Sequence, residues 1–398
     1  MALRFSRRRR LVLAHAKQLP HSLQYVKKEA RIFHYHEAVS WELSRPFNDL
    51  PRLPPAAELE TIPVLKAVTS ARVELARLEQ ATHLMVDPHV LLNTIPLLEA
   101  QASSEIENIV TTADALFQQA QLNESSANPE VKETLRYQSA LWLGLHKMRS
   151  RALSAQVAVD VCSQIKGQPM EIRAVPGVRI ADAGTGDVRY SPPEGPDLIR
   201  GLLSDWERYI HSDDDVDPVV RMAVAHYQFE AIHPFTDGNG RTGRILNILQ
   251  LVSEGLLTEP VLYLSRSIID SKADYYRLLR AVTAESAWEE WVLYMIEAVR
   301  EAAAATTRTI AEIQRVRGDF VAQHRQNSPG IANADFQALL FAQPYTRIGT
   351  VMQTCGVSRP TATNWLNSLV DAGAMETLKI GRDRLYLNQA FLSTLIGR

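Results

Sequence analysis

Apolar residues recur at steps of three and four along most of the chain. In the first half these positions are Val68, Ala71, Leu75 and Leu78, then Leu91, Ile95, Leu98, Ala102, Ile106 and Ile109. This spacing places one apolar face on a helix. The period returns at Val220, Val224, Tyr227 and Ala231 and persists, with interruptions, to about Gln323. The pattern predicts a mainly α fold.

Residues 173–196 break the helical period. Val178, Ile180, Val188 and Tyr190 flank a polar segment, 182–187, that contains two glycines. Apolar residues at alternate positions around a glycine turn are typical of a β-hairpin. We therefore predict a hairpin over about 178–190, followed by another helix from Pro196.

The last part of the chain has a different pattern. Ile348 and Val351 indicate a short helix, Ser358 is suited to cap the next one, and apolar residues alternate on both sides of 381–383. This order predicts a small winged helix-turn-helix over 331–398. Residues 346–398 carry six Lys or Arg against three Asp or Glu. That modest excess leaves two interpretations open, DNA contact and a module that dimerises or recruits a protein.

We expect several parts in a chain of 398 residues, which is long for one core. The predicted division is a basic leader and extension (1–45), a helical N-terminal region (46–130), a core (131–300), a connecting helix and linker (301–330) and the terminal module (331–398). Residues 1–31 contain nine Lys or Arg and one Glu. We interpret this leader as a solvated tail, and a transit peptide or a nucleic-acid-binding arm remains open.

Composition excludes several classes of protein. The net charge of −2 gives no general attraction to nucleic acid, and two cysteines cannot form a disulfide framework or a four-cysteine metal site. Since no apolar run approaches the roughly 18 residues of a membrane span, we expect no membrane partner. The sequence favours a reducing, cytoplasmic location.

The candidate chemistry lies in residues 233–244, between two helical stretches. Asp237 and the glycines at 238 and 240 favour a loop with exposed N–H groups, and a helix is predicted from about Arg241 to Leu251. Arg241 and Arg244 share one face of that helix. Backbone amides, a helix N-terminus and two guanidinium groups together predict a polyphosphate site. Asp237 is a suitable Mg²⁺ ligand, and His233 is a suitable base.

The string His-Pro-Phe-Thr-Asp-Gly-Asn-Gly-Arg-Thr-Gly-Arg resembles the signature of the Fic family, H-P-F-x-D/E-G-N-G-R-x-x-R, at every specified position. The resemblance extends along most of residues 46–300. It implies a helical Fic-type core with a hairpin flap that docks a target protein. It also implies transfer of AMP from ATP to a Ser, Thr or Tyr hydroxyl of that target, with Mg²⁺ as cofactor.

The resemblance also implies roles for single residues. His233 would be the general base, Phe235 an anchor of the loop, and Asp237 the Mg²⁺ ligand. The nucleotide-binding residues would be Gly238, Asn239, Gly240, Arg241, Thr242, Gly243 and Arg244, with Tyr275 or Tyr276 at the adenosine end. The branch of the family that transfers a whole phosphate has Lys where this chain has Gly240, which favours AMP transfer here.

Upstream, residues 103–108 allow two interpretations. Ser104 and Glu107 fit a capping box that starts a helix. In the Fic context, Ser103, Glu107 and Asn108 instead resemble the family's S/T-x-x-x-E-G/N inhibitory motif, on a helix over about 103–112. The resemblance implies that Glu107 pairs with Arg244 and blocks productive ATP binding.

Two other functions remain open at this stage. One is a DNA-binding transcription regulator whose Fic core senses nucleotide. The other is an AMP-removing hydrolase that uses Glu107 to position water. A homodimer also remains open.

Overall fold

The computed structural model describes residues 41–397 except 86, 88, 123–127, 182–184 and 327. Residues 1–40 of the basic leader and the middle of the predicted glycine turn lie outside this description. From Glu42 onward the chain forms one compact unit.

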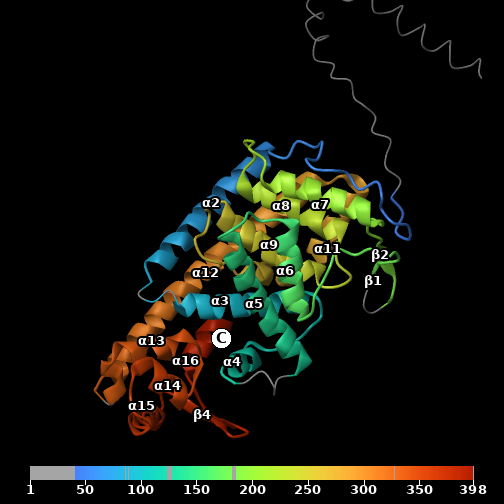
Figure 1. The fold of residues 1–398 in the computed structure, drawn as a ribbon. Helices are drawn as coiled ribbons and strands as arrows, with labels where there is room; N and C mark the ends of the chain where they lie inside the picture. The colour runs from blue at the N-terminus through green and yellow to red at the C-terminus, as the bar shows by residue number, and fades with distance from the viewer. Residues whose placement is uncertain are drawn as a thin grey trace, which may run out of the picture. The chain divides into compact units, whose positions relative to one another are not determined.

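The fold is mainly helical, as predicted (Figure 1). Before the hairpin the helices are α2 (Ile62–His83), α3 (His89–Ile106), α4 (Ala113–Ala120), α5 (Pro129–Met148) and α6 (Ala155–Lys166). After it come α7 (Pro196–Ile210), α8 (Pro218–Ile232), α9 (Asn239–Ser253), α10 (Leu264–Asp270), α11 (Lys272–Glu285) and α12 (Trp288–His324). The predicted hairpin is present as β1 (Ile180–Ala181) and antiparallel β2 (Val188–Tyr190), with Ile180 opposite Tyr190.

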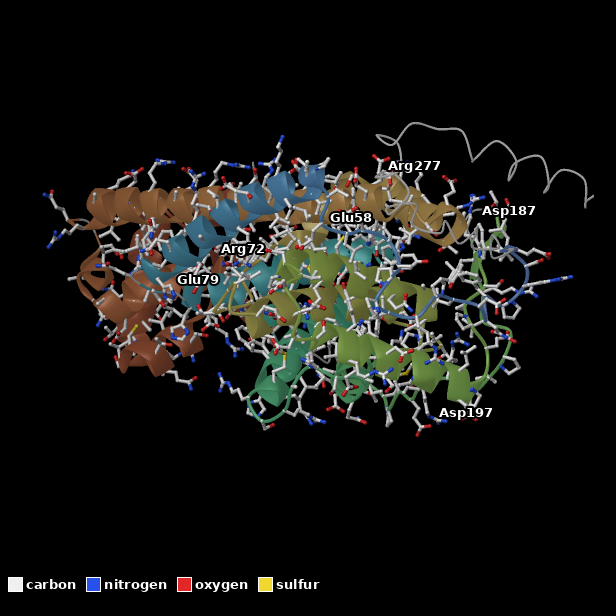
Figure 2. The ribbon with its side chains drawn as sticks, turned by 90° about the horizontal axis from the view of Figure 1, so that it is seen from above. Glu58, Arg72, Glu79, Asp187, Asp197 and Arg277 are labelled. Carbon is white, nitrogen blue, oxygen red and sulfur yellow. The ribbon has the colours of Figure 1, made fainter. Side chains whose placement is uncertain are left out.

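The apolar stripe at Val68, Ala71, Leu75 and Leu78 is buried on α2, which packs along α12 (Figures 1 and 2). Charged side chains such as Asp187, Asp197 and Arg277 project from the surface (Figure 2). In the described part of the chain, no helix combines the length and the low polarity needed to cross a membrane.

Three predicted domain boundaries fall inside helices. The boundary at 130/131 lies in α5, that at 300/301 in α12, and that at 330/331 in the 3₁₀ helix Pro329–Ala332. Gly330, in the predicted linker, is closely packed, because a Cβ there would lie 2.7 Å from Trp365 and 2.8 Å from Phe336. Glycine allows this close packing, and the sequence pattern does not distinguish that role from a flexible joint.

Helices α8 and α9 form the centre of the core and are buried on most sides. The loop that joins them carries the candidate site, and helices α5, α6, α7 and α12 pack against the pair. Because both helices are enclosed, the ends that they present to the loop are held in place.

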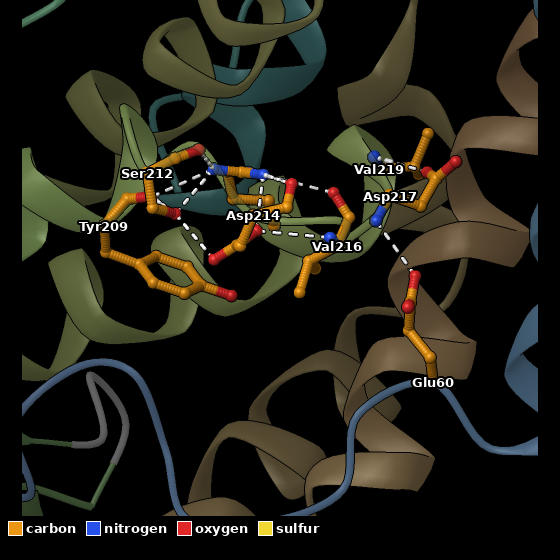
Figure 3. A network of polar contacts seen from close by, with 8 residues as sticks. Glu60, Tyr209, Ser212, Asp214, Val216, Asp217 and Val219 are labelled. Carbon is orange, nitrogen blue, oxygen red and sulfur yellow. Dashed lines mark hydrogen bonds and ion pairs between the residues drawn. The ribbon is translucent and has the colours of Figure 1, made fainter.

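A network of polar contacts around Ser212, Asp214 and Asp217 precedes and starts α8 (Figure 3), and the guanidinium of Arg221 holds it together. This guanidinium donates to Oγ of Ser212 (2.6 Å), to Oδ1 of Asp214 (2.8 Å) and to the carbonyl of Val216 (3.2 Å). Asp217 then caps α8 by accepting from the N–H of Val219 (2.8 Å). One buried guanidinium thus organises the α7–α8 loop and sets the direction of the helix that leads to His233.

The C-terminal part contains α13 (Ala334–Ala342), β3 (Tyr345–Thr346), α14 (Ile348–Cys355), α15 (Arg359–Asp371), β4 (Glu376–Ile380), β5 (Asp383–Leu387) and α16 (Gln389–Ile396). The strands form one antiparallel sheet in the order β3-β5-β4. The two short helices and the hairpin therefore lie where the sequence predicts them. Helix α4 docks on this part, because Tyr345 donates to Asp114 over 2.6 Å.

Candidate active site

His233 ends α8 in a left-handed conformation, with φ 50° and ψ 60°. A residue with a side chain adopts this conformation at some cost, so its surroundings must hold it. Arg173, only 2% exposed, donates to the carbonyls of His233 (2.8 Å), Ile232 (3.2 Å) and Pro193 (2.5 Å). Arg173 therefore ties the segment before the flap to the backbone beside the candidate base.

Burial, together with the nearby charge of Arg173, lowers the pKa of His233 to about 4. The ring is therefore neutral at neutral pH. A neutral imidazole can accept a proton from an incoming hydroxyl group, as a general base must.

The loop after His233 is closed by Asn239. Its Oδ1 accepts from the N–H of Phe235, and its Nδ2 donates to the carbonyl of Phe235, both over 2.8 Å. Phe235 is 1% exposed and packs against Phe229, as expected of an anchor. The side chain of Asn239 therefore shapes the loop, and only its backbone N–H is left for an anion.

Helix α9 begins at Asn239, two residues earlier than predicted. Gly238 precedes it with φ 84°, a conformation that favours glycine. The first helical hydrogen bond runs from the N–H of Thr242 to the carbonyl of Gly238 (3.0 Å). The N–H groups of residues 239–241 thus lie at the open N-terminus of a helix, where an anion binds readily.

Arg244 and Glu107 meet across the site, with Nη2 and Oε1 2.8 Å apart. Arg244 also donates through Nε to Oγ of Ser103 (2.8 Å) and through Nη2 to the Ser103 carbonyl (2.9 Å). The Arg244 side chain is 1% exposed and that of Glu107 is 34% exposed. Burial favours the protonated form of Glu107, but the charge and hydrogen bond of Arg244 outweigh it and lower the Glu107 pKa.

The structure corrects the prediction of a helix over 103–112. Helix α3 starts at His89 and ends at Ile106, so the motif lies at a helix C-terminus and the capping-box interpretation is wrong. Asn108 has a φ of 62°. Its N–H donates to the carbonyl of Glu105 (2.9 Å), and the N–H of Ile109 donates to the carbonyl of Ser104 (3.0 Å). This is a Schellman ending, which favours Gly or Asn at position 108.

Gly240 and Gly243 each lie where a side chain would not fit. A Cβ on Gly240 would collide with Oε1 of Glu107, and one on Gly243 would lie 2.5 Å from Oε1 of Glu230. Burial raises the pKa of Glu230 to about 8. Glu230 was not predicted from the sequence, although it lies one helical turn before His233 on α8.

Asp237 is held by groups from other helices. Its Oδ2 lies 2.6 Å from Nζ of Lys166, which also reaches Oε1 of Glu133 (2.9 Å). Nη1 of Arg241 lies 2.6 Å from the same Glu133 oxygen. Lys166 on α6 and Glu133 on α5 were missed, because nothing in their local sequence connects them with the signature.

The Asp237 side chain is 59% exposed, so its carboxylate is accessible to a cation. Within the described residues, no group of three or more His, Cys, Asp and Glu side chains is arranged to hold a metal ion. One carboxylate suits Mg²⁺ when substrate phosphates provide further ligands. The residues present therefore fit a magnesium ion that is shared with a nucleotide.

The two tyrosines differ. Tyr275 is 1% exposed, and its hydroxyl lies 2.8 Å from Nε2 of His226, so it packs in the core. The Tyr276 residue is 42% exposed; burial of its hydroxyl, together with the nearby charge of Glu107, raises the Tyr276 pKa. Of the pair, Tyr276 remains the candidate for the adenosine end.

The fold and the site thus define a helical protein with a loop that leads into an open helix N-terminus, a neutral histidine, and a carboxylate paired with an arginine of that helix. Three protein-family profiles match consecutive parts of the chain. They are the Fic/DOC family N-terminal region (65–146), the Fic/DOC family (153–251) and the C-terminal domain of protein adenylyltransferase SoFic-like proteins (318–391). The chain belongs to the Fic/DOC family.

Relatives agree with this assignment. The chain is 35% identical over 89 residues to protein adenylyltransferase fic-1 of Caenorhabditis elegans, covering 22% of this chain and 16% of that protein. It is 38% identical over 81 residues to the probable protein adenylyltransferase aq_aa38 of Aquifex aeolicus, covering 20% of this chain and 25% of that protein. The aligned parts therefore span a quarter or less of these curated relatives.

A solved structure shares the fold. It is a Fic family protein from Desulfovibrio desulfuricans G20, with a TM-score of 0.54 and 22% identity. The match covers 84% of this chain and 98% of that one.

Proposed function

We propose that this protein is an autoinhibited protein adenylyltransferase, which transfers AMP from ATP to a Ser, Thr or Tyr hydroxyl of a target protein. The observation that carries the proposal is the complete loop from His233 to Arg244, with its second arginine engaged by Glu107 (2.8 Å). The relatives that bear the name protein adenylyltransferase support it over their aligned parts.

In the proposed reaction the target hydroxyl oxygen attacks the α-phosphorus of ATP. The bond from that phosphorus to the oxygen bridging to the β-phosphate breaks, and pyrophosphate leaves. His233 takes the hydroxyl proton and later releases it to solvent. The N–H groups of 239–241 and the guanidinium groups of Arg241 and Arg244 hold the phosphates, and such positioned charges contribute most of the stabilisation of the transition state.

Asp237 would hold Mg²⁺, which supplies positive charge to the phosphates when it is bound. Arg173 keeps His233 in place and neutral. Gly243 lets the first turn of α9 lie close to α8, because a Cβ there would be 2.5 Å from Oε1 of Glu230. Thr242 and Gly243 stay predicted nucleotide-binding residues.

Glu107 is the proposed brake. It occupies the guanidinium of Arg244, which the terminal phosphate of ATP needs. A carboxylate at the C-terminal end of α3 is disfavoured by the helix dipole, so the contact depends on Arg244 and can be displaced by a stronger anion. The same carboxylate would position a water in the reverse reaction, and the assay below includes that product.

The test uses α-phosphate-labelled ATP, Mg²⁺ and the purified full chain, with and without cell lysate. Wild type, Glu107→Gly and His233→Ala are compared for label that stays covalently on protein. We expect more label with Glu107→Gly and none with His233→Ala. Equal labelling by all three would refute the proposal. Release of free AMP from a labelled target, lost in Glu107→Gly, would identify the hydrolase instead.

We also propose that a target docks on the flap, where β1 and β2 leave strand edges to which an extended peptide can add. We propose the C-terminal part as a winged helix whose exposed residues Arg359 and Asn364 are available to a partner. DNA contact there, a homodimer and a cytoplasmic location stay predictions. A DNA mobility shift at moderate salt that persists in His233→Ala would favour the alternative function, a DNA-binding transcription regulator.

A further inference from the structure

Four charged side chains form a ring beside the phosphate site. Lys166 bridges Asp237 and Glu133, and Arg241 contacts the same Glu133 oxygen and approaches Asp237 to 3.7 Å. Two cations and two carboxylates cancel, so the ring has no net charge. Lys166 and Glu133 have no role in the proposed reaction so far.

Lys166 is confined in a way that ordinary surface lysines are not. Its side chain is 17% exposed, and it is the last residue of α6, just before Gly167 in the left-handed conformation. Its aliphatic part lies over the start of the phosphate loop, because a Cβ on Gly238 would be 3.5 Å from Cδ of Lys166. The ammonium group is thus placed next to the open N-terminus of α9.

Glu133 is suited to hold this ammonium. Its carboxylate accepts from both Lys166 and Arg241, and these contacts outweigh burial and lower the pKa of Glu133. Since Arg241 is 3% exposed, Glu133 also supplies the countercharge that a buried guanidinium requires. Glu133 thereby fixes two cations at the edge of one anion site.

We propose that Lys166 is a phosphate-binding residue, that Glu133 positions it, and that its ammonium neutralises Asp237 until the nucleotide arrives. The inference rests on the proposed function and deepens it. The divalent ion then enters together with the nucleotide and not before it.

The order follows from the charges. Without nucleotide, a divalent cation approaching Asp237 meets an ammonium group at 2.6 Å from one carboxylate oxygen and a guanidinium at 3.7 Å from the other, so repulsion offsets attraction. A triphosphate brings several negative charges. Lys166 can then turn to a phosphate oxygen, which leaves Asp237 to the metal ion.

The test separates the metal from the nucleotide. Three full-length proteins carry Glu107→Gly to free Arg244: the parent, Lys166→Met and, as the matched control, Lys166→Arg. Binding of Mn²⁺ alone is measured by electron paramagnetic resonance, and binding of ATP in EDTA by calorimetry.

We expect Lys166→Met to bind Mn²⁺ alone roughly 10- to 100-fold more tightly than the parent, and ATP in EDTA more weakly by a similar factor, as for one charge-assisted hydrogen bond. Lys166→Arg should resemble the parent in both. The gain in Mn²⁺ affinity is a result that misfolding cannot produce.

Equal Mn²⁺ affinity in the parent and Lys166→Met, or unchanged ATP affinity in EDTA, overturns the inference. Normal ATP binding with the expected Lys166 effects, but without AMP transfer, overturns the proposed function alone. The two failures are therefore distinguishable.

Discussion

The contact between Glu107 and Arg244 predicts an unusual variant, one that is less stable and yet binds its ligand better. In Glu107→Gly, Arg244 keeps its bonds to Ser103 but loses its only carboxylate within 4 Å in the described structure. The guanidinium is buried, so we expect the free energy of unfolding to fall by about 1–3 kcal/mol, less than for a fully buried pair because Glu107 is about a third exposed.

The same change should strengthen ATP binding. Wild type must break one charge-assisted hydrogen bond, worth about 1.5–3 kcal/mol, before the terminal phosphate reaches Arg244. Its loss therefore corresponds to roughly a 10- to 100-fold gain in ATP affinity. A group that only supported the fold would lower stability and affinity together.

Calorimetry with ATP and Mg²⁺ gives the affinity, and thermal unfolding without nucleotide gives the change in stability. The matched control is Glu105→Gly, which introduces the same flexibility two residues earlier and leaves the Glu107–Arg244 contact intact. The reasoning is refuted if Glu107→Gly folds but binds ATP no more tightly than wild type, or if Glu105→Gly gives the same gain.

Three further predictions concern the backbone and the histidines. Arg173→Lys removes hydrogen-bond donors to the backbone around His233. Because only the positioning of His233 is lost, kcat should fall roughly 10- to 100-fold while the ATP affinity stays unchanged. An equal loss of ATP affinity would contradict this prediction. Burial lowers the pKa of His226 to about 3 and that of His233 to about 4, so both bind protons more tightly when unfolded. The two histidines therefore contribute a rise in the free energy of unfolding between about pH 4 and 6.5, by about 1.4 kcal/mol per pH unit each, and Glu230, with its raised pKa, opposes this rise above about pH 4.5. His226→Gln should lower the slope by the contribution of one histidine in denaturant titrations. Asn108→Val should cost about 1–2 kcal/mol through its positive φ and raise ATP affinity by loosening Glu107, whereas Asn108→Gly should behave like wild type; similar ATP affinities for the two variants would contradict this.

The helical class, the hairpin and the elements of the C-terminal part were predictable from local pattern. Steps of three and four reflect the geometry of a single helix, and alternation around a glycine turn reflects that of a hairpin. The loop from His233 to Arg244 could also be predicted from the sequence, because its residues are consecutive. The domain boundaries were harder to predict. Helix α12, for example, continues through residue 300, where the sequence has no local signal that would end a helix.

Other features depended on contacts between distant segments. Whether Ser103 to Glu107 start or end a helix depends on α3, which begins at His89 and carries the motif to its C-terminal end against Arg244. The burial of Tyr275 against His226 is likewise a property of the packed core.

The sequence by itself determined the groups of the predicted phosphate loop, since consecutive residues contain them. Only the tertiary structure decided which charges oppose or support them. Lys166 and Glu133 are far from Asp237 in the sequence. The packing of α5 and α6 nevertheless places the Lys166 ammonium group within hydrogen-bonding distance of both carboxylates. Electrostatic interaction depends on distance in space, and that distance exists only once the helices have packed.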